Sequence, residues 1–199
     1  MWKIELDPFA LSDNLMAQEL QGLEVSQYTF PDDGTLDVPA LKLMRIGLHA
    51  AEKIGCTDMM WNPAARHVLN FSDSSVSDLP LNMWPTNAQT CVTHHPLFDI
   101  LPWPSVRDKM IYAFDLPLLQ RPPAARDANA IANIIYDMDD PTEGFRVSGQ
   151  EGFEPGNWEV GQAFFQKWWW SLDRDVVNRS NALRLARGVQ PLRLAFEST

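Results

Sequence analysis

The chain has 199 residues, of which 45% are hydrophobic and 21% are charged, so it is long and apolar enough for one domain with an ordinary core. Its formal net charge of −10 argues against a protein that coats nucleic acid or docks on an anionic membrane, because both surfaces repel an acidic protein. The total charge still leaves room for a local basic patch that binds RNA or an acidic site that attracts a cationic substrate.

The chain is predicted to divide at about residue 36. Residues 1–36 form an N-terminal extension with a short helix over 14–23 and a turn at 31–34. Residues 37–199 form a single α-helical domain, because the sequence shows no internal repeat and no alternation of strands with helices. The expected fold class is therefore mainly α, with one helical domain and a long proline-rich loop packed around it.

A helix opens this domain. Leu41 and Leu48 share one face, Pro39 suits the first turn, and Gly55 follows as a plausible C-terminal cap.

The proline-rich segment 56–103 has no sustained hydrophobic period. A structureless run of this length is abnormal inside a compact domain. The segment is therefore either an ordered loop that wraps the helices or a set of short elements, one of them a strand over 67–71.

Helices are predicted for most of the second half. Ser105 and Asp108 resemble a capping box, and Asn157 can cap a later helix. An acidic loop over 137–159 holds seven acidic residues and one arginine, a local net charge of −6. The expected helices run from Ser105 to the turn before Pro117, from Pro122 to Met138, from Asn157 to Leu172 and from Asp175 to Arg187.

The two cysteines, Cys56 and Cys91, are too few for a disulfide framework or a multi-cysteine metal motif. The N-terminal run carries charges where a signal peptide needs an unbroken apolar stretch, and no stretch approaches the roughly 18 apolar residues of a membrane span. We expect a soluble, cytoplasmic protein that does not bind membranes, with nuclear residence as the alternative.

Two sequence blocks together resemble a large fungal family, that of the uncharacterised domain found C-terminal to bZIP regions in transcription factors. The first block runs from His94 to Ile111 and contains a Leu-Pro-Trp-Pro turn followed by Arg-Asp. The resemblance extends over residues 41–194, most of the chain. The second block comprises Gly156–Val160, Phe164, Phe165, Trp168, Trp169, Trp170, Asn178, Asn181, Arg184, Arg187 and Gly188.

The chain departs from a bZIP protein in one respect. Before Leu41 it has a single basic residue, Lys3, and no heptad run, whereas a bZIP region needs a basic helix followed by heptads. It is therefore expected to be this domain standing alone, which does not bind DNA in the bZIP manner.

Stand-alone relatives imply a second resemblance, to fungal arginine-containing cyclodipeptide synthases. Those enzymes join two amino acids, delivered by aminoacyl-tRNA, into a diketopiperazine. The resemblance implies aminoacyl-tRNA and arginine, or another cationic small molecule, as partners. The bacterial synthases use a serine on a Rossmann-like fold, and neither that serine context nor those strands are found here. A non-catalytic regulatory or ligand-sensing module is the alternative, and it fits the acidic charge better.

Four residues of the first block are candidates for catalysis. His95 and Asp99 lie four residues apart and suggest a general base with an orienting carboxylate. Arg107 suits an anionic group, with Asp108 beside it. In the structural alternative, the prolines make a rigid turn and the pair formed by Arg107 and Asp108 pins the start of the helix.

A metal site is a weaker alternative for this block. His94, His95 and Asp99 are all metal-ligand types, but adjacent histidines point apart in most backbones and no histidine follows residue 95. With no phosphate-binding loop and no dinucleotide fingerprint either, the expectation is no metal and no cofactor.

The substrate is expected to contact Trp103, Trp158, Trp169 and Glu159. Consecutive residues on a helix are about 100° apart, so the tryptophans at 168–170 cannot all face one core. Core positions are favoured for Trp158 and Trp168, with Trp169 as a third candidate, and the remaining ring is free to stack on an aromatic or guanidinium group. The acidic loop is usually just solvated surface, but Glu159 at its end can clamp the guanidinium of arginine.

The C-terminal segment carries the expected tRNA contact, made by Arg179, Arg184 and Arg187. An ordinary basic helix face is an equally good interpretation. A covalent aminoacyl-enzyme also needs a nucleophile, and none of the candidates lies in a recognisable nucleophile motif. These candidates are Ser105, Ser180, Cys91 and Thr93.

Overall fold

The computed structural model describes residues 39–70, 79–149 and 152–194, so the helix expected over 14–23 and the turn at 31–34 lie outside the described residues. All described residues belong to one compact unit, residues 37–199. In this part of the chain the structure is mainly helical, as the sequence predicts, with seven α-helices and one pair of two-residue strands.

The elements follow one another in a simple order. The α-helices are α2 (Pro39–Ile54), α3 (Thr57–Met60), α5 (Asn87–Cys91), α6 (Pro104–Asp115), α7 (Ala130–Met138), α8 (Gln162–Trp168) and α9 (Arg174–Ala186). The antiparallel strands are β1 (Arg146–Val147) and β2 (Trp158–Glu159). Short 3-10 turns are η1 (Leu81–Met83), η2 (Pro96–Phe98), η3 (Leu118–Gln120), η4 (Pro123–Arg126), η5 (Pro155–Asn157) and η6 (Trp169–Ser171).

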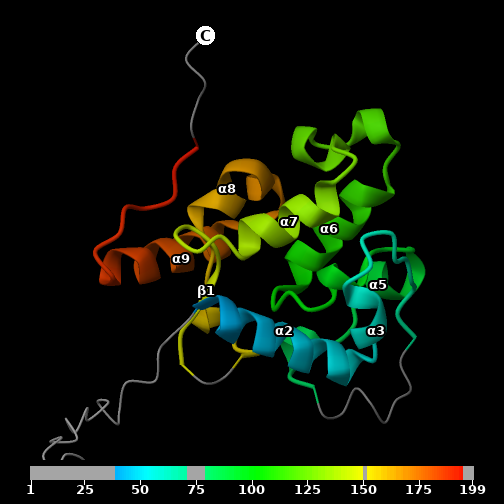
Figure 1. The fold of residues 1–199 in the computed structure, drawn as a ribbon, viewed down its shortest axis with the longest axis horizontal. Helices are drawn as coiled ribbons and strands as arrows, with labels where there is room; N and C mark the ends of the chain where they lie inside the picture. Colours follow the sequence, from blue (N-terminus) through cyan, green and yellow to red (C-terminus); the bar gives the residue numbers. More distant parts are fainter. Residues whose placement is uncertain (1–38, 71–78, 150–151, 195–199) are drawn as a thin grey trace, which may run out of the picture. The chain divides into compact units, whose positions relative to one another are not determined.

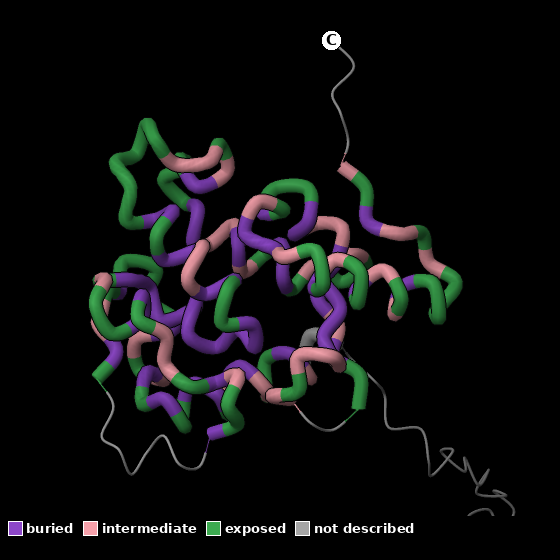
Figure 2. Tube along the Cα trace, turned by 180° about the vertical axis from the view of Figure 1, so that it is seen from behind, coloured by how far each residue is buried: buried purple, intermediate pink, exposed green. Residues whose placement is uncertain are grey.

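Helix pairs close in sequence pack together, and the hairpin joins the two ends of the described chain. Helix α5 packs on α6, α7 packs on α8, α2 packs on β1, and α9 packs on β2 (Figure 1). Figure 2 shows the buried positions gathered in the interior and the exposed ones along the outer turns. Within the described residues, no helix combines the length and the apolar character that a membrane crossing requires.

The first helix confirms its prediction. Helix α2 begins at Pro39, and Gly55 follows it in the left-handed conformation with φ of 78°. Glycine adopts this conformation without the steric cost that a Cβ would add, so it can end the helix in a tight turn.

Where it is described, segment 56–103 consists of short elements, which was one of the two alternatives for it. A capping box between Thr86 and Gln89 starts α5, and Pro96 opens the turn η2. The strand expected over 67–71 is reduced to one bridge, in which His67 and His94 exchange two backbone hydrogen bonds of 2.9 Å. Repeated prolines prevent long helices but suit the first positions of such turns.

Three helix starts differ from their prediction. Helix α6 begins at Pro104, and the Ser105 hydroxyl donates to Asp173 instead of capping. The prolines at 122 and 123 open only the turn η4, because Asp127 is extended, and α7 begins at Ala130. Asn157 precedes a strand, since Trp158 and Glu159 pair with β1.

Helix α8 starts only after Gly161, for a reason of close packing. A Cβ on Gly161 would lie 1.9 Å from the carbonyl oxygen of Glu143, so no other residue fits there without moving the backbone. This approach allows the Ala163 amide to bond to the same carbonyl, which joins the start of α8 to the first part of the acidic loop.

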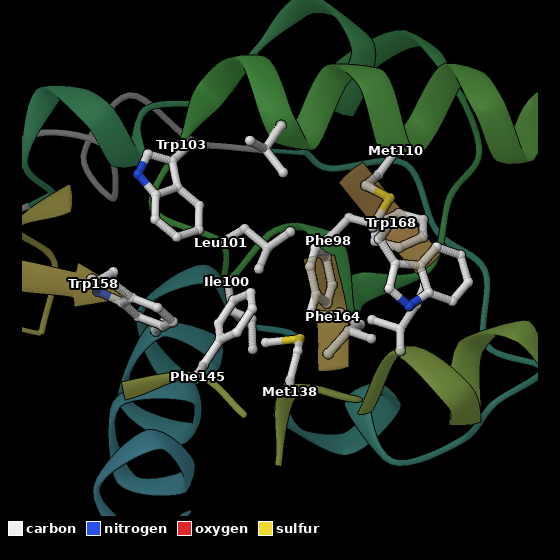
Figure 3. Packing of buried hydrophobic residues seen from close by; sticks show 14 of the residues in the cluster. Phe98, Ile100, Leu101, Trp103, Met110, Met138, Phe145, Trp158, Phe164 and Trp168 are labelled. Atoms are coloured by element: carbon white, nitrogen blue, oxygen red, sulfur yellow. The ribbon is translucent and has the colours of Figure 1, made fainter. Parts of the chain in front are cut away.

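The core is rich in aromatic rings, and the expected core positions of Trp158 and Trp168 are confirmed by their burial. Figure 3 shows Trp103, Phe145 and Trp158 close together, with ring centroids 5.8–6.2 Å apart. The indole of Trp168 donates to Asp137 at 2.8 Å. Trp169, by contrast, is 50% exposed on η6.

The two cysteines are expected to react very differently with iodoacetamide. Burial, with a smaller contribution from the charge of Asp99, raises the pKa of Cys56 to about 12, whereas Cys91 is exposed. At pH 8 only about one Cys56 in ten thousand is the reactive thiolate. Mass analysis of the native protein should show alkylation of Cys91 alone, and Cys56 should react only after unfolding. Similar rates for both thiols would contradict the buried position of Cys56.

Candidate functional site

The candidate residues gather in two places. Glu159 meets arginines from the second half of α9 and its C-terminal end at the β1–β2 hairpin. The other four candidates lie around η2 and on α6: His95 just before η2, Asp99 just after it, and Arg107 and Asp108 on α6.

At the hairpin, the Glu159 carboxylate binds a guanidinium through two hydrogen bonds. Nη2 of Arg187 donates to Oε1 at 2.6 Å, and Nε donates to Oε2 at 3.1 Å. Bonding to Glu159 raises the pKa of Arg187, against the opposing effect of burial. The Glu159 side chain is only 4% exposed, whereas that of Arg187 is 39% exposed. The site can therefore recognise a guanidinium, and an internal one is bound there.

Beside this pair lies a pocket of about 210 Å³. Its polar groups come mainly from the hairpin, and its apolar groups come from α9 and from Val147 of β1. The lining residues are Arg146, Val147, Ser148, Asn157, Glu159, Leu183, Ala186 and Arg187. Small-molecule pockets of about 300–1,000 Å³ are usual, so this one suits a group the size of one amino-acid side chain.

The three arginines expected to bind tRNA differ in their availability. Arg184 is 3% exposed and bonds to Glu143 at 2.9 Å and to the carbonyl of Gln190 at 2.8 Å. Arg179 is exposed and donates to the carbonyl of Gly156 at 2.7 Å. Arg184 therefore holds the structure together at the hairpin, while Arg179 and Arg187 reach solvent.

The second place is a buried cluster centred on Asp99, which we call the His–Asp cluster: His67, Gln89, His94 and Asp99. The backbone bridge sets His67 beside His94, and Asp99 follows the turn η2. Asp99 Oδ2 lies 2.6 Å from Nε2 of His67. Its Oδ1 lies 2.8 Å from Nε2 of His94 and 2.6 Å from the amide nitrogen of Gln89.

Hydrogen bonding indicates the charge state of this cluster. Nδ1 of His94 lies 2.7 Å from the carbonyl of Val92, which can only accept, so Nδ1 carries a proton; the contact of Nε2 with Asp99 at 2.8 Å is a donated hydrogen bond when Asp99 is ionised. Burial lowers the pKa of His94, but the hydrogen bond and charge of Asp99 outweigh it and raise the net value. Burial likewise opposes ionisation of Asp99, yet bonds from His67 and His94 hold its pKa below the ordinary value.

His95, the expected general base, is almost completely buried. Its Nε2 donates to the carbonyl of Asn62 at 3.0 Å, and its Nδ1 accepts from the Leu97 amide at 3.1 Å. Burial lowers its pKa, which favours the neutral ring that this bonding pattern needs. His95 thus packs beside the cluster with both nitrogens already bonded.

Arg107 is fully buried and bonds to backbone rather than to a carboxylate. Its guanidinium donates to the carbonyls of Leu101, Asn82 and Trp84 at 2.8–2.9 Å. Burial lowers the pKa of Arg107 to about 10, against the opposing charges of Asp99 and Asp108. Oδ1 of Asp108 is buried without a hydrogen-bond partner among the described residues. Arg107 therefore joins η1 and the turn before α6 to the helix.

Several residues of both places were missed by the sequence interpretation. His67 and Gln89 complete the His–Asp cluster, and Arg146 and Ser148 line the pocket. His67 had a weak signal, because it opens the short strand-like run over 67–71. The predicted substrate contacts Trp103 and Trp158 lie in the core.

Comparison with known proteins gives one positive result. The profile of a family described as Domain of unknown function (DUF3425) matches residues 62–178, more than half of the chain. That range contains the whole His–Asp cluster and the hairpin but ends within α9. No curated protein and no solved structure matches the chain.

Proposed function

The chain belongs to the family of the domain of unknown function DUF3425, known to occur C-terminal to fungal bZIP regions, and from that premise we propose that it makes an arginine-containing cyclic dipeptide from aminoacyl-tRNA. The observation that best supports the proposal is the bidentate hydrogen bonding of Glu159 to a guanidinium. This contact lies in the wall of a pocket about the size of one side chain.

The proposed recognition step is an exchange of guanidinium groups. A substrate arginine takes the place of Arg187 on Glu159, with the same two hydrogen bonds in the same planar geometry. Arg187 is well placed for this exchange because it is the more exposed partner. Once released, its charge is free to contact the phosphates at the end of the tRNA, together with Arg179.

The proposed chemistry needs little beyond positioning. The amine of one aminoacyl ester attacks the carbonyl carbon of the other, an amide forms, and the tRNA hydroxyl leaves with the ester oxygen; a second such attack closes the ring. One base must accept each amine proton. His95 was the base expected from the sequence, but it lies apart from the hairpin pocket and its Nε2 already carries the proton that it donates to Asn62, so the proposal assigns this role to no residue of the pocket.

We expect Glu159→Gln to lower product formation by about 10- to 100-fold, because a charge-assisted bidentate contact contributes about 1.5–3 kcal/mol. The experiment is expression in a host without the pathway, followed by mass analysis of the medium for arginine-containing diketopiperazines. Glu52→Gln, at an exposed acidic residue of α2, is the matched control and should keep wild-type yield. No new product from folded wild-type protein would refute the proposal.

A second candidate is a non-catalytic ligand-binding module, favoured by the complete bonding of His95 and the burial of Arg107. Titration with arginine methyl ester and citrulline methyl ester separates the two ideas, since citrulline has the same shape without the charge. Selective binding of the arginine ester without any diketopiperazine favours the module. Equal binding of both esters contradicts guanidinium recognition in either role.

A further inference from the structure

We propose that His67, His94 and Asp99 form a binding site for one divalent first-row transition metal ion of the Zn²⁺ class. Two imidazole nitrogens and one carboxylate, contributed by two separate segments of the chain, converge in the interior. The three ligand atoms all lie within 4.8 Å of one another. This inference is independent of the proposed synthase activity.

The ligand set fits the metal class. Zn²⁺ binds imidazole nitrogen and carboxylate oxygen at about 2.0–2.2 Å, and two histidines with one carboxylate leave a position open for another ligand. Ligand atoms of one such ion lie roughly 3–3.4 Å apart. Here Nε2 of His67 and Nε2 of His94 lie 2.6 Å and 2.8 Å from the carboxylate, so an outward shift of about half an ångström admits the ion.

The surrounding groups already hold the ligands in the orientation that a metal needs. Nδ1 of His94 donates to the Val92 carbonyl, which turns Nε2 toward the site. The amide of Gln89 donates to Oδ1 of Asp99 and fixes the carboxylate. Metal-bound histidines almost always donate their second nitrogen to a carbonyl or carboxylate in this way.

The backbone fixes the relative position of the two histidines. His67 and His94 are direct partners in the antiparallel bridge, so their side chains leave the same side of it, with ring centroids 4.8 Å apart. His94 and Asp99 are fully buried, whereas the His67 side chain is 12% exposed. The entry path for an ion therefore lies past His67.

The exchange of protons for the ion balances. Without metal, a proton lies between Nε2 of His94 and the carboxylate, and another joins His67 to it. A bound ion replaces both contacts: the His94 Nε2 proton leaves to solvent, and His67 keeps its proton by moving it to Nδ1. No redox step is involved.

His95, the residue next to His94, does not share in the contacts to Asp99. His95 is just as buried, but its two nitrogens bond to Asn62 and Leu97. The fourth histidine, His49, is exposed on α2. The exposed His49 is therefore the control for the two proposed histidine ligands.

The test uses the full chain, treated with EDTA and then dialysed against Zn²⁺ or Co²⁺. We expect one ion per chain, and Co²⁺ absorption bands of the intense kind given by four or five ligands. His67→Gln keeps an amide that can donate to Asp99 but removes one imidazole ligand of the ion. The affinity for Zn²⁺ and Co²⁺ should therefore fall at least about 100-fold. His49→Gln should bind as the wild type does.

A second measurement needs no variant. Long-range ¹H–¹⁵N spectra of the wild-type chain should show the Nε2 resonances of two histidines changing on Zn²⁺ addition, with the other two unchanged. No uptake by the folded wild-type chain, equal affinity after His67→Gln, or loss of binding only after His49→Gln would each overturn the proposal. The cluster would then be a purely structural carboxylate anchor. Mg²⁺ and Ca²⁺, which prefer all-oxygen ligands, should not compete.

Discussion

Replacing Arg107 by alanine is expected to lower the free energy of unfolding by about 3–5 kcal/mol. The guanidinium is fully buried and satisfies carbonyls from Leu101, Asn82 and Trp84 at once. Alanine leaves all of them without their donor in the interior, where each unpaired group costs about 1–3 kcal/mol. Urea unfolding followed by tryptophan fluorescence measures the change.

Two variants control this experiment. Arg107→Lys keeps the charge but presents a point donor instead of a planar fork, so it should recover only part of the loss. Arg45→Ala removes an exposed arginine from α2 and should change stability by less than about 0.5 kcal/mol. If Arg107→Ala unfolds at the wild-type urea concentration, the buried network does not support the fold and a functional role for Arg107 gains weight.

The second large effect is expected at Trp158. Trp158→Ala should cost about 3–5 kcal/mol, because the side chain fills the centre of an aromatic cluster and its indole donates to the Gly152 carbonyl at 2.8 Å. Trp169→Ala is the matched control, since the same residue type there is half exposed. It should cost less than about 0.5 kcal/mol.

This pair of tryptophan variants also separates two roles. Both residues were expected from the sequence to contact substrate, but only Trp169 presents its ring to solvent. Thermal or urea unfolding of both variants, run beside the product assay, distinguishes a core position from a binding position. Trp158→Ala with wild-type stability and lost product would contradict the core role.

The sequence predicted helices well where a long apolar face determined them. Helix α2 has such a face, with Pro39 and Gly55 at its ends, and its limits are as expected. The β1–β2 hairpin was missed because two-residue strands are too short to show a period of two. Asn157 before an aromatic run resembles a helix start, and only the close approach of Gly161 to Glu143 shows why the helix begins later.

The candidate site was predictable in part. Arg107 shares a helix face with Ile111 and Phe114, a spacing that signals a buried arginine. The partnership of His67 with His94 could not be read from the chain, because it depends on a single bridge between distant segments. Glu159 was expected to hold the guanidinium of a substrate, and that remains a prediction; the contact with Arg187 required the fold.

Helix α9 is attached to the rest of the domain by many polar contacts and by two valines, Val176 and Val177, that pack against the core. Its buried positions are Val176, Ser180 and Arg184, and the Ser180 hydroxyl accepts the Val160 amide at 2.9 Å. Detaching α9 would therefore expose little apolar surface, so the increase in heat capacity on detachment should be small. Its amide protons should exchange through a local opening whose free energy hardly changes with denaturant, unlike those of α6. We therefore expect α9 to open before the rest of the domain, and a ligand at the hairpin to shift the free energy of that opening.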